Sequence, residues 1–130
     1  MEDVTGLRVV FQRLVDAFNA NDLDALVASV HEGIVQTGAF SPTAVDGKVA
    51  FKKVYQSFFS DYDNVTFTPI NPHFRVNTST GVSWGHFALS VKPKGAPMQI
   101  PVGCYTLTFT KTDQEWLVVA AHFSWLPENT

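Results

Sequence analysis

The chain has 130 residues with a formal net charge of −3, and only 16% of its residues are charged. This length is typical of one domain, so we predict a single domain over residues 1–130. No cluster of Lys or Arg supports a nucleic-acid partner, no apolar run is long enough for a membrane-spanning helix, and the single cysteine, Cys104, excludes an internal disulfide.

The first half of the chain has the apolar spacing of helices. A helix is expected over residues 5–19, where apolar side chains recur at helical spacing, and a second helix within residues 19–31. Residues 33–40 are expected to form a short strand and residues 41–47 a loop. A third helix is expected over residues 46–62.

After Tyr62 the spacing of apolar residues changes from helical to alternating. Strands are expected within residues 64–78, 81–92, 98–111 and 116–127, and short turns separate the last three. Helices followed by an antiparallel meander predict an α+β protein with its helices packed on one face of a curved sheet.

Three stretches of the chain carry a resemblance to a known family. They are "VVFQRLVDAFNANDLDALVASVHEGIVQTG", "DGKVAFKKVY" and the closing pattern W-x₅-H-x-S-x₂-P from Trp116 to Pro127. Together they resemble the nuclear transport factor 2 and ketosteroid isomerase superfamily, and most of all its SnoaL-like branch. That branch is similar to the association domain of calcium/calmodulin-dependent kinases. The resemblance implies a cone-shaped fold, in which three helices and a strongly curved, mostly antiparallel sheet enclose a cavity.

The isomerase members of that superfamily use known catalytic groups, so this sequence can be checked for the same groups. Their mechanism needs a carboxylate base and an oxyanion hole made of a tyrosine and a protonated acid. The matching positions here hold Gly38 for the base, Leu14 for the tyrosine and Gly103 for the acid. None of these side chains can transfer a proton, so a steroid isomerase of the known mechanism is not expected. Tyr55, on the third helix, is one side chain near the isomerase active site that is retained in this sequence.

Alternation along the strands predicts which side chains face the cavity. If Gly103 faces inward, the expected hairpin registers bring His86 and His122 to either side of it, with backbones about 10 Å apart. Both histidines are expected to be catalytic, and Gly103 leaves open space between them. The expected ligand-binding residues are Trp84, Tyr105, Tyr55, Gly103, Ser124, Phe18, Phe40 and Phe58. A β-bulge in either hairpin would reverse these faces.

Each of these residues also has a purely structural interpretation. His122 could do no more than hydrogen-bond Ser124 or a backbone carbonyl, and His86 could fill the cavity mouth. Gly103 could serve the curvature of the sheet, while Trp84 and Tyr55 could pack in the core. No carboxylate or thiol is placed on the inner strand faces to complete a metal site, so neither a metal nor a cofactor is expected.

The same alternation places large apolar side chains on the outer face of the sheet. A monomer would not leave so much aromatic surface in water, and the resemblance also implies dimers through this face. We therefore expect a homodimer whose interface contains Phe87, Leu89, Phe123 and Trp125.

Two functional classes follow from the sequence. In the first, the protein binds a small, mostly apolar organic molecule in its cavity, and a pocket histidine supplies acid–base catalysis of an isomerase, cyclase or dehydratase type. In the second, it is a non-catalytic binding or assembly module like the kinase association domain. The N-terminal segment lacks a secretory signal pattern, and we expect a cytoplasmic protein.

Overall fold

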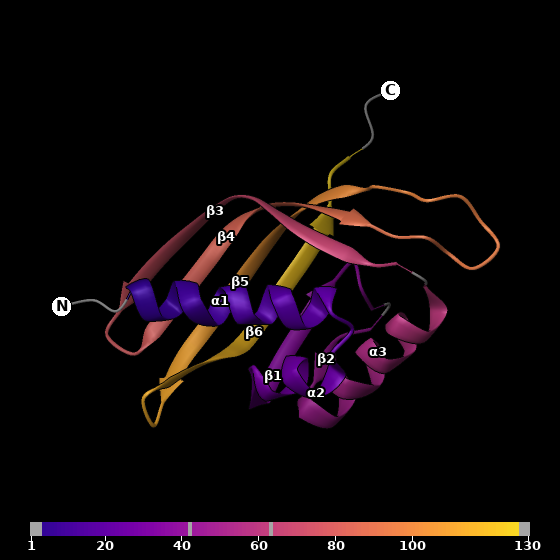
Figure 1. Cartoon of the computed structure of the whole chain (residues 1–130). Helices are drawn as coiled ribbons and strands as arrows, with labels where there is room; N and C mark the ends of the chain where they lie inside the picture. The colour runs from indigo at the N-terminus through magenta and orange to yellow at the C-terminus, as the bar shows by residue number, and fades with distance from the viewer. Residues whose placement is uncertain (1–3, 42, 63, 128–130) are drawn as a thin grey trace.

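The computed structural model describes residues 4–41, 43–62 and 64–127. The described chain forms three helices and six strands (Figure 1). The helices are α1 (Val4–Asn19), α2 (Leu23–Ala28) and α3 (Lys48–Asp61). The strands are β1 (Val30–Gly38), β2 (Val45–Asp46), β3 (Thr66–Asn77), β4 (Thr80–Ser90), β5 (Val102–Thr112) and β6 (Glu115–Trp125).

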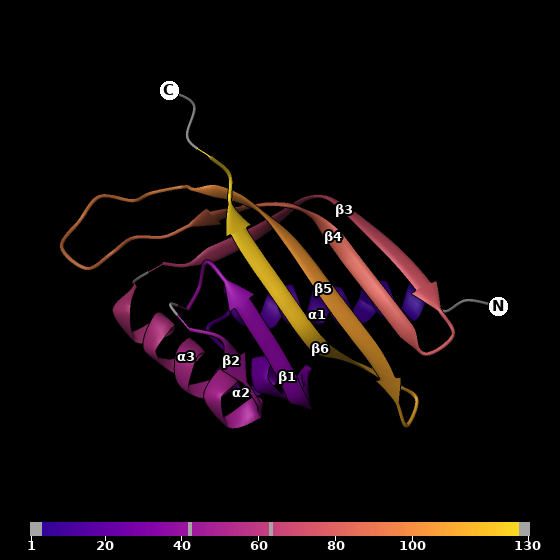
Figure 2. The ribbon, with the colours of Figure 1, turned by 180° about the vertical axis from the view of Figure 1, so that it is seen from behind.

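All six strands belong to one sheet with the order β2-β1-β6-β5-β4-β3. The pairs along this order are antiparallel except for β1 and β6, which run parallel. The sheet curves around α1, and the helices lie on its concave side (Figure 1). Seen from behind, none of the described helices covers the convex face (Figure 2). The predicted α+β architecture, with helices on one face of a curved sheet, is confirmed.

The helices are positioned by apolar side chains that face the sheet. On α1, Leu7, Phe11, Val15 and Phe18 are buried on one side of the helix, as their spacing predicts. The start of α2 is fixed by Asp22, whose carboxylate accepts a hydrogen bond from the Ala25 backbone N–H at 3.1 Å.

The segment between β1 and α3 differs from the sequence-based expectation. The loop expected over residues 41–47 contains the short strand β2, in which Val45 pairs with Gln36 of β1. Val45 is buried, and β2 forms the edge of the sheet on the side of α3. The first strand is also longer than expected, since it begins at Val30.

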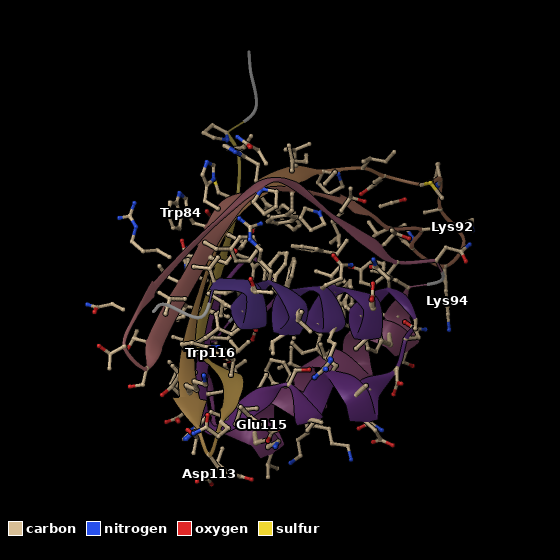
Figure 3. All side chains as sticks on the ribbon, turned by 60° about the vertical axis from the view of Figure 1, so that its left-hand side comes forward. Trp84, Lys92, Lys94, Asp113, Glu115 and Trp116 are labelled. Atoms are coloured by element: carbon tan, nitrogen blue, oxygen red, sulfur yellow. The ribbon has the colours of Figure 1, made fainter. Side chains whose placement is uncertain are left out.

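The face assignment on β4 is wrong. Gly103 of β5 pairs with Phe87 and not with His86, so the register differs from the expected one by a single residue. Such a slip moves every side chain of a strand to the opposite face. Phe87 and Leu89, expected at an outer interface, are therefore buried under the helices. Trp84 and His86 lie on the convex side, where Figure 3 shows Trp84 pointing away from α1.

The face assignment on β6 is wrong in the same way. Gly103 pairs with Trp125, and His122 pairs with Thr106, whose side chain is exposed. The register of this hairpin shifts between Thr108 and Phe109, which is the kind of bulge that reverses faces. Phe123 and Trp125 consequently lie on the helix side, and His122 and Ser124 lie on the convex side.

The space expected beside Gly103 is occupied. A Cβ atom built on Gly103 would overlap the Ser124 carbonyl oxygen and lie 2.8 Å from the ring of Phe87. Gly103 is thus required by close packing, and it leaves no opening between strands. The reason for this glycine is therefore contact with Ser124 and Phe87, which differs from the sheet curvature considered from the sequence.

We expect Gly103→Ala to lower the free energy of unfolding by about 1–3 kcal/mol, because a methyl group there overpacks the core against backbone and a buried ring. Urea denaturation measures the change. Gly33→Ala is the matched control, since a Cβ at Gly33 would meet only the His31 ring, at 3.4 Å. Equal stability of the two variants would contradict the close packing at Gly103.

Candidate functional site

An apolar cavity of about 50 Å³ lies between the helices and the concave face of the sheet. Side chains from all three helices and from β1, β3, β5 and β6 line it, and most of them are Phe, Leu or Val. Phe11 and Phe18 of α1 form one wall, and Phe67 of β3 adds another ring. A cavity of this kind suits apolar groups better than water.

One pair of polar side chains interrupts the apolar lining. The Tyr55 hydroxyl of α3 donates a hydrogen bond to Oε1 of Gln36 on β1, at 3.0 Å. Gln36 is only 2% exposed. Its Nε2 is the only buried side-chain nitrogen or oxygen of the described residues that has no hydrogen-bond partner. The cavity therefore carries one unsatisfied donor group.

Burial also determines the protonation of Tyr55. Desolvation raises the pKa of its phenol well above the usual value of a tyrosine, and the hydrogen bond with Gln36 opposes this shift only in part. The hydroxyl stays protonated at neutral pH. It acts as a hydrogen-bond donor and orients the amide of Gln36.

Some of the residues expected from the sequence meet at this cavity. Phe18, Phe40 and Tyr55 line it, and so does Leu14, which occupies the position of the isomerase tyrosine. Phe58 packs beside the cavity, with its ring centroid 5.8 Å from that of Phe40. These side chains come from α1, α3 and the segment after β1, so packing of the helices on the sheet brings them together.

Tyr105 faces inward as predicted, but it does not line the cavity. Its ring stacks on Phe11 with centroids 5.7 Å apart, and its hydroxyl lies 3.0 Å from the hydroxyl of Ser83. Burial raises the pKa of Tyr105, while the hydrogen bond with Ser83 opposes the shift. Tyr105 is part of the packed core between α1 and the sheet.

The position matching the isomerase base cannot hold a side chain without movement of the backbone. Gly38 has a φ of +110°, which an L-residue rarely adopts. A Cβ there would overlap the Phe123 carbonyl oxygen and lie 2.9 Å from its carbonyl carbon. A carboxylate at this position is therefore incompatible with the way β1 and β6 pack.

The expected histidine pair is absent from the cavity. His86, His122, Trp84 and Ser124 all lie on the convex face, and none of them lines the cavity. His122 Nδ1 is 2.9 Å from the hydroxyl oxygen of Thr37 on β1. No cavity-facing histidine occurs among the described residues.

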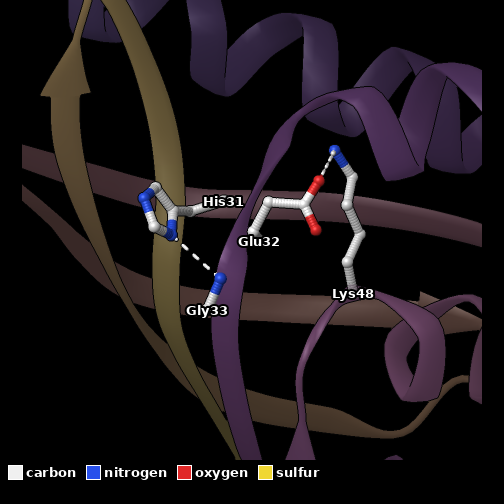
Figure 4. Close-up of polar contacts among 4 residues, drawn as sticks. All are labelled: His31, Glu32, Gly33 and Lys48. Atoms are coloured by element: carbon white, nitrogen blue, oxygen red, sulfur yellow. Dashed lines mark hydrogen bonds and ion pairs between the residues drawn. The ribbon is translucent and has the colours of Figure 1, made fainter.

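The other two histidines, His31 and His73, do not line the cavity either, and both make contacts outside it. The ring of His73 stacks on Trp84, with centroids 5.2 Å apart. His31 Nδ1 accepts a hydrogen bond from the Gly33 backbone N–H at 2.9 Å, and Glu32 between them forms an ion pair with Lys48 at 4.0 Å (Figure 4).

A wider groove of about 750 Å³ lies next to the cavity. Phe40 lines both spaces, and its ring stacks on Phe123 with centroids 4.5 Å apart. Trp125, at the end of β6, lines the groove and contacts Phe40 at 5.7 Å between centroids. Phe40 therefore separates the cavity from an open apolar groove.

Gln36 was not recognised from the sequence, although a signal was present. In "GIVQTG" it alternates with Ile34 and Gly38, so it shares the inward face of that strand. A polar residue on a buried face is more informative than an apolar one.

Neither a metal cluster nor a membrane span is found in the described part of the chain. Over residues 4–41, 43–62 and 64–127, no group of three or more His, Cys, Asp or Glu is placed to hold an ion. No helix in the same ranges is long and apolar enough to cross a membrane.

The sequence of residues 7–128 matches the model of the SnoaL-like domain. The chain belongs to this family. The SnoaL-like resemblance inferred from the sequence is thus confirmed. No curated protein shows a significant match to the chain.

Solved structures show how closely this SnoaL-like protein follows a common fold. A candidate dehydratase of the nuclear transport factor 2-like family from Streptomyces avermitilis is 13% identical, with a TM-score of 0.88 and coverage of 97% of this chain and 98% of that one. A ketosteroid isomerase-like protein from Erwinia carotovora atroseptica is 16% identical, with a TM-score of 0.83 and coverage of 98% of each chain.

A third similar structure carries a different kind of name. It is a candidate calcium/calmodulin-dependent protein kinase II association domain from Xanthomonas campestris, 15% identical, with a TM-score of 0.84 and coverage of 95% of this chain and 87% of that one. At these identities the similarities establish a shared cone-shaped fold.

The buried phenol of Tyr55 predicts a pH dependence of stability. Below about pH 10 the phenol is protonated in both the folded and the unfolded chain. Above it, only the unfolded chain loses the proton, because burial holds the folded pKa of Tyr55 higher. The free energy of unfolding should therefore fall with rising pH, by up to about 1.4 kcal/mol per pH unit from this group.

Tyr55→Phe removes this contribution, so urea denaturation of the variant should show a shallower loss of stability above about pH 10 than the wild type. All other ionisable groups are the same in the two proteins, so their contributions cancel in the comparison. Parallel stability curves for the two proteins between about pH 9 and 11 would contradict the burial of an uncharged Tyr55 phenol.

Proposed function

We propose that this SnoaL-like protein binds a small, uncharged, mostly apolar organic molecule in the cavity between its helices and sheet. The observation that carries the proposal is the lining itself, in which apolar side chains surround a single polar pair, Gln36 and Tyr55. Small-molecule sites are commonly apolar and concave, with a few polar groups that fix the orientation of the ligand.

The size of the cavity limits the ligand. A volume of about 50 Å³ is smaller than the roughly 150 Å³ of an engineered protein cavity that binds benzene. A ligand of one ring or more would displace a lining side chain. Phe40 is the best placed to move, because it is only half-buried, follows the end of β1 and borders the open groove.

The chemistry of the lining favours binding over acid–base catalysis. Tyr55 is the only ionisable side chain among the residues that line the cavity, and burial raises the pKa of its phenol, which disfavours the phenolate. No histidine of the described residues lines the cavity, and the two expected to be catalytic, His86 and His122, lie on the convex face of the sheet. The names of the similar structures, a dehydratase and an isomerase-like protein, are compatible with a small organic ligand.

Filling the cavity tests this function. Leu14 lines the cavity and is half-buried on α1, so Leu14→Trp should place a larger ring in the binding space. We expect the variant to lose binding of small neutral hydrocarbons and ketones, with an apparent Kd at least about tenfold weaker. NMR titration of isotope-labelled protein measures the affinity.

Val9→Trp is the matched control, because Val9 lies on the same helix, is 46% exposed and does not line the cavity. This control should bind like the wild type. Equal binding by wild type and Leu14→Trp, or no binding by the wild type, would contradict the proposal.

We also propose that two copies associate through the convex face of the sheet. Of the side chains expected there from the sequence, Phe87, Leu89 and Phe123 are buried. Trp125 is 41% exposed but lies on the helix side.

The convex face carries other apolar groups. Val35 of β1 and Ile70 of β3 are more than 40% exposed. Trp84 of β4 is half-buried, and its ring stacks on that of His73. No described helix covers this face (Figure 2), and the similar structure from Xanthomonas campestris is named for association.

A charge introduced on the convex face tests the association. Val35→Lys should convert a dimer to a monomer, because a charge buried in a symmetric interface meets its own copy. Sedimentation velocity at micromolar concentration measures the change. Val49→Lys is the control, since Val49 is exposed on α3; a monomeric wild type would contradict the proposal.

A further inference from the structure

We propose that Gln36 is the residue that selects the ligand, and that it selects a neutral molecule with a hydrogen-bond acceptor such as a ketone or ester carbonyl. The proposal rests on the proposed function, because it names the class of molecule bound in the same cavity. Three observations carry it: the unpaired amide, the space beside it and the absence of charge on the cavity wall.

The first observation is the state of the Gln36 amide. Its Oε1 accepts the hydrogen bond from the Tyr55 hydroxyl at 3.0 Å, so that end of the group is satisfied. Its Nε2 carries two N–H donors, is buried, and has no partner among the described residues. A buried donor without a partner is costly. A ligand that supplies an acceptor would remove that cost on binding.

The second observation is the space beside the amide. Gln36 of β1 pairs with Ala121 of β6, which in turn pairs with Leu107 of β5. All three line the cavity, and they form one row across the concave face. Ala121 is paired with Gln36 and lines the same cavity, and its side chain is a single methyl group. A ligand atom can therefore approach the amide along this row.

The third observation is the character of the wall. The fifteen lining residues include no Asp, Glu, Lys, Arg or His, and Tyr55 remains a protonated donor. A charged ligand would lose its hydration without gaining a countercharge, which is strongly unfavourable. The ligand is therefore uncharged. Its acceptor pairs with the Gln36 amide, and the rest of its surface contacts apolar side chains.

Tyr55 has a positioning role in this arrangement. Its hydroxyl holds Oε1 of Gln36 on the α3 side, which leaves Nε2 as the group available to a ligand. Phe18 and Phe51 pack against the Tyr55 ring, with centroids 6.1 and 4.6 Å away. These contacts fix the ring and, through it, the orientation of the amide.

Two probes of the same shape test the assignment. Cyclopentanone carries a carbonyl acceptor, whereas methylenecyclopentane replaces that oxygen by a CH₂ group. The ratio of their two Kd values is measured by NMR titration for the wild type and for Gln36→Leu. We expect Gln36→Leu to shift this ratio roughly fivefold to tenfold against the ketone, with methylenecyclopentane binding retained or strengthened.

A control variant and a direct signal accompany the titration. Gln12→Leu removes an exposed glutamine on α1 that hydrogen-bonds only Asp16, and it should leave the ratio unchanged. In the wild type, the side-chain amide resonance of Gln36 should move downfield with cyclopentanone and not with methylenecyclopentane. This signal needs no variant, so it tests the proposal even if Gln36→Leu fails to fold.

The outcomes separate the two proposals. If the wild type binds neither probe, the proposed function fails. If both bind but the ratio is the same in wild type and Gln36→Leu, or the Gln36 amide resonance does not respond to the ketone, ligand binding stands and the role of Gln36 is overturned. Preferential binding of pyrrole, a neutral donor, would reverse the expected polarity and also overturn the assignment.

Discussion

The pairing of Gly103 with its two neighbours decides which side chains of the central sheet face the helices. Phe87 lies on one side of Gly103 and Trp125 on the other, and the ring of Phe87 occupies the space that any side chain at Gly103 would need. Because alternate residues of a strand face opposite ways, this one contact orients β4, β5 and β6 together. The aromatic core and the histidine-bearing convex face both follow from it.

The cavity exists because this aromatic core closes incompletely. Rings from α1, α3 and the sheet pack edge to face around Phe18 and Tyr55, and Ala121 of β6 lines the space that they leave. The polar pair of Gln36 and Tyr55 lies at that gap and spans β1 and α3. A buried, half-satisfied amide has an energetic cost, which a purely structural core would avoid by using an apolar residue.

The two faces of the sheet therefore have different chemistry. The concave face offers apolar contact and one amide donor, whereas the convex face presents histidines, threonines and Trp84 to the exterior. The carboxyl groups of the isomerase mechanism could not be restored here by substitution alone, because the backbone also excludes them. Gly38 and Gly103 pack against neighbouring strands so closely that neither position can hold a carboxylate in this backbone.

The sequence by itself determined the order and type of the main elements and the α+β class, because helical and alternating apolar spacing are local properties of the chain. The SnoaL-like family was indicated separately, by the resemblance of three stretches of the sequence. The sequence also indicated Phe18, Phe40 and Tyr55 as cavity residues through the expected packing of helices on the sheet. Only the tertiary structure decided which strand faces meet the helices. A one-residue difference in the β4–β5 register and a bulge between β5 and β6 reversed the faces, and neither can be read from the alternation within a single strand. Alternation does place Gln36 on the inward face, but its contacts with Tyr55 and Ala121 join residues that are distant in the chain and adjacent only after folding.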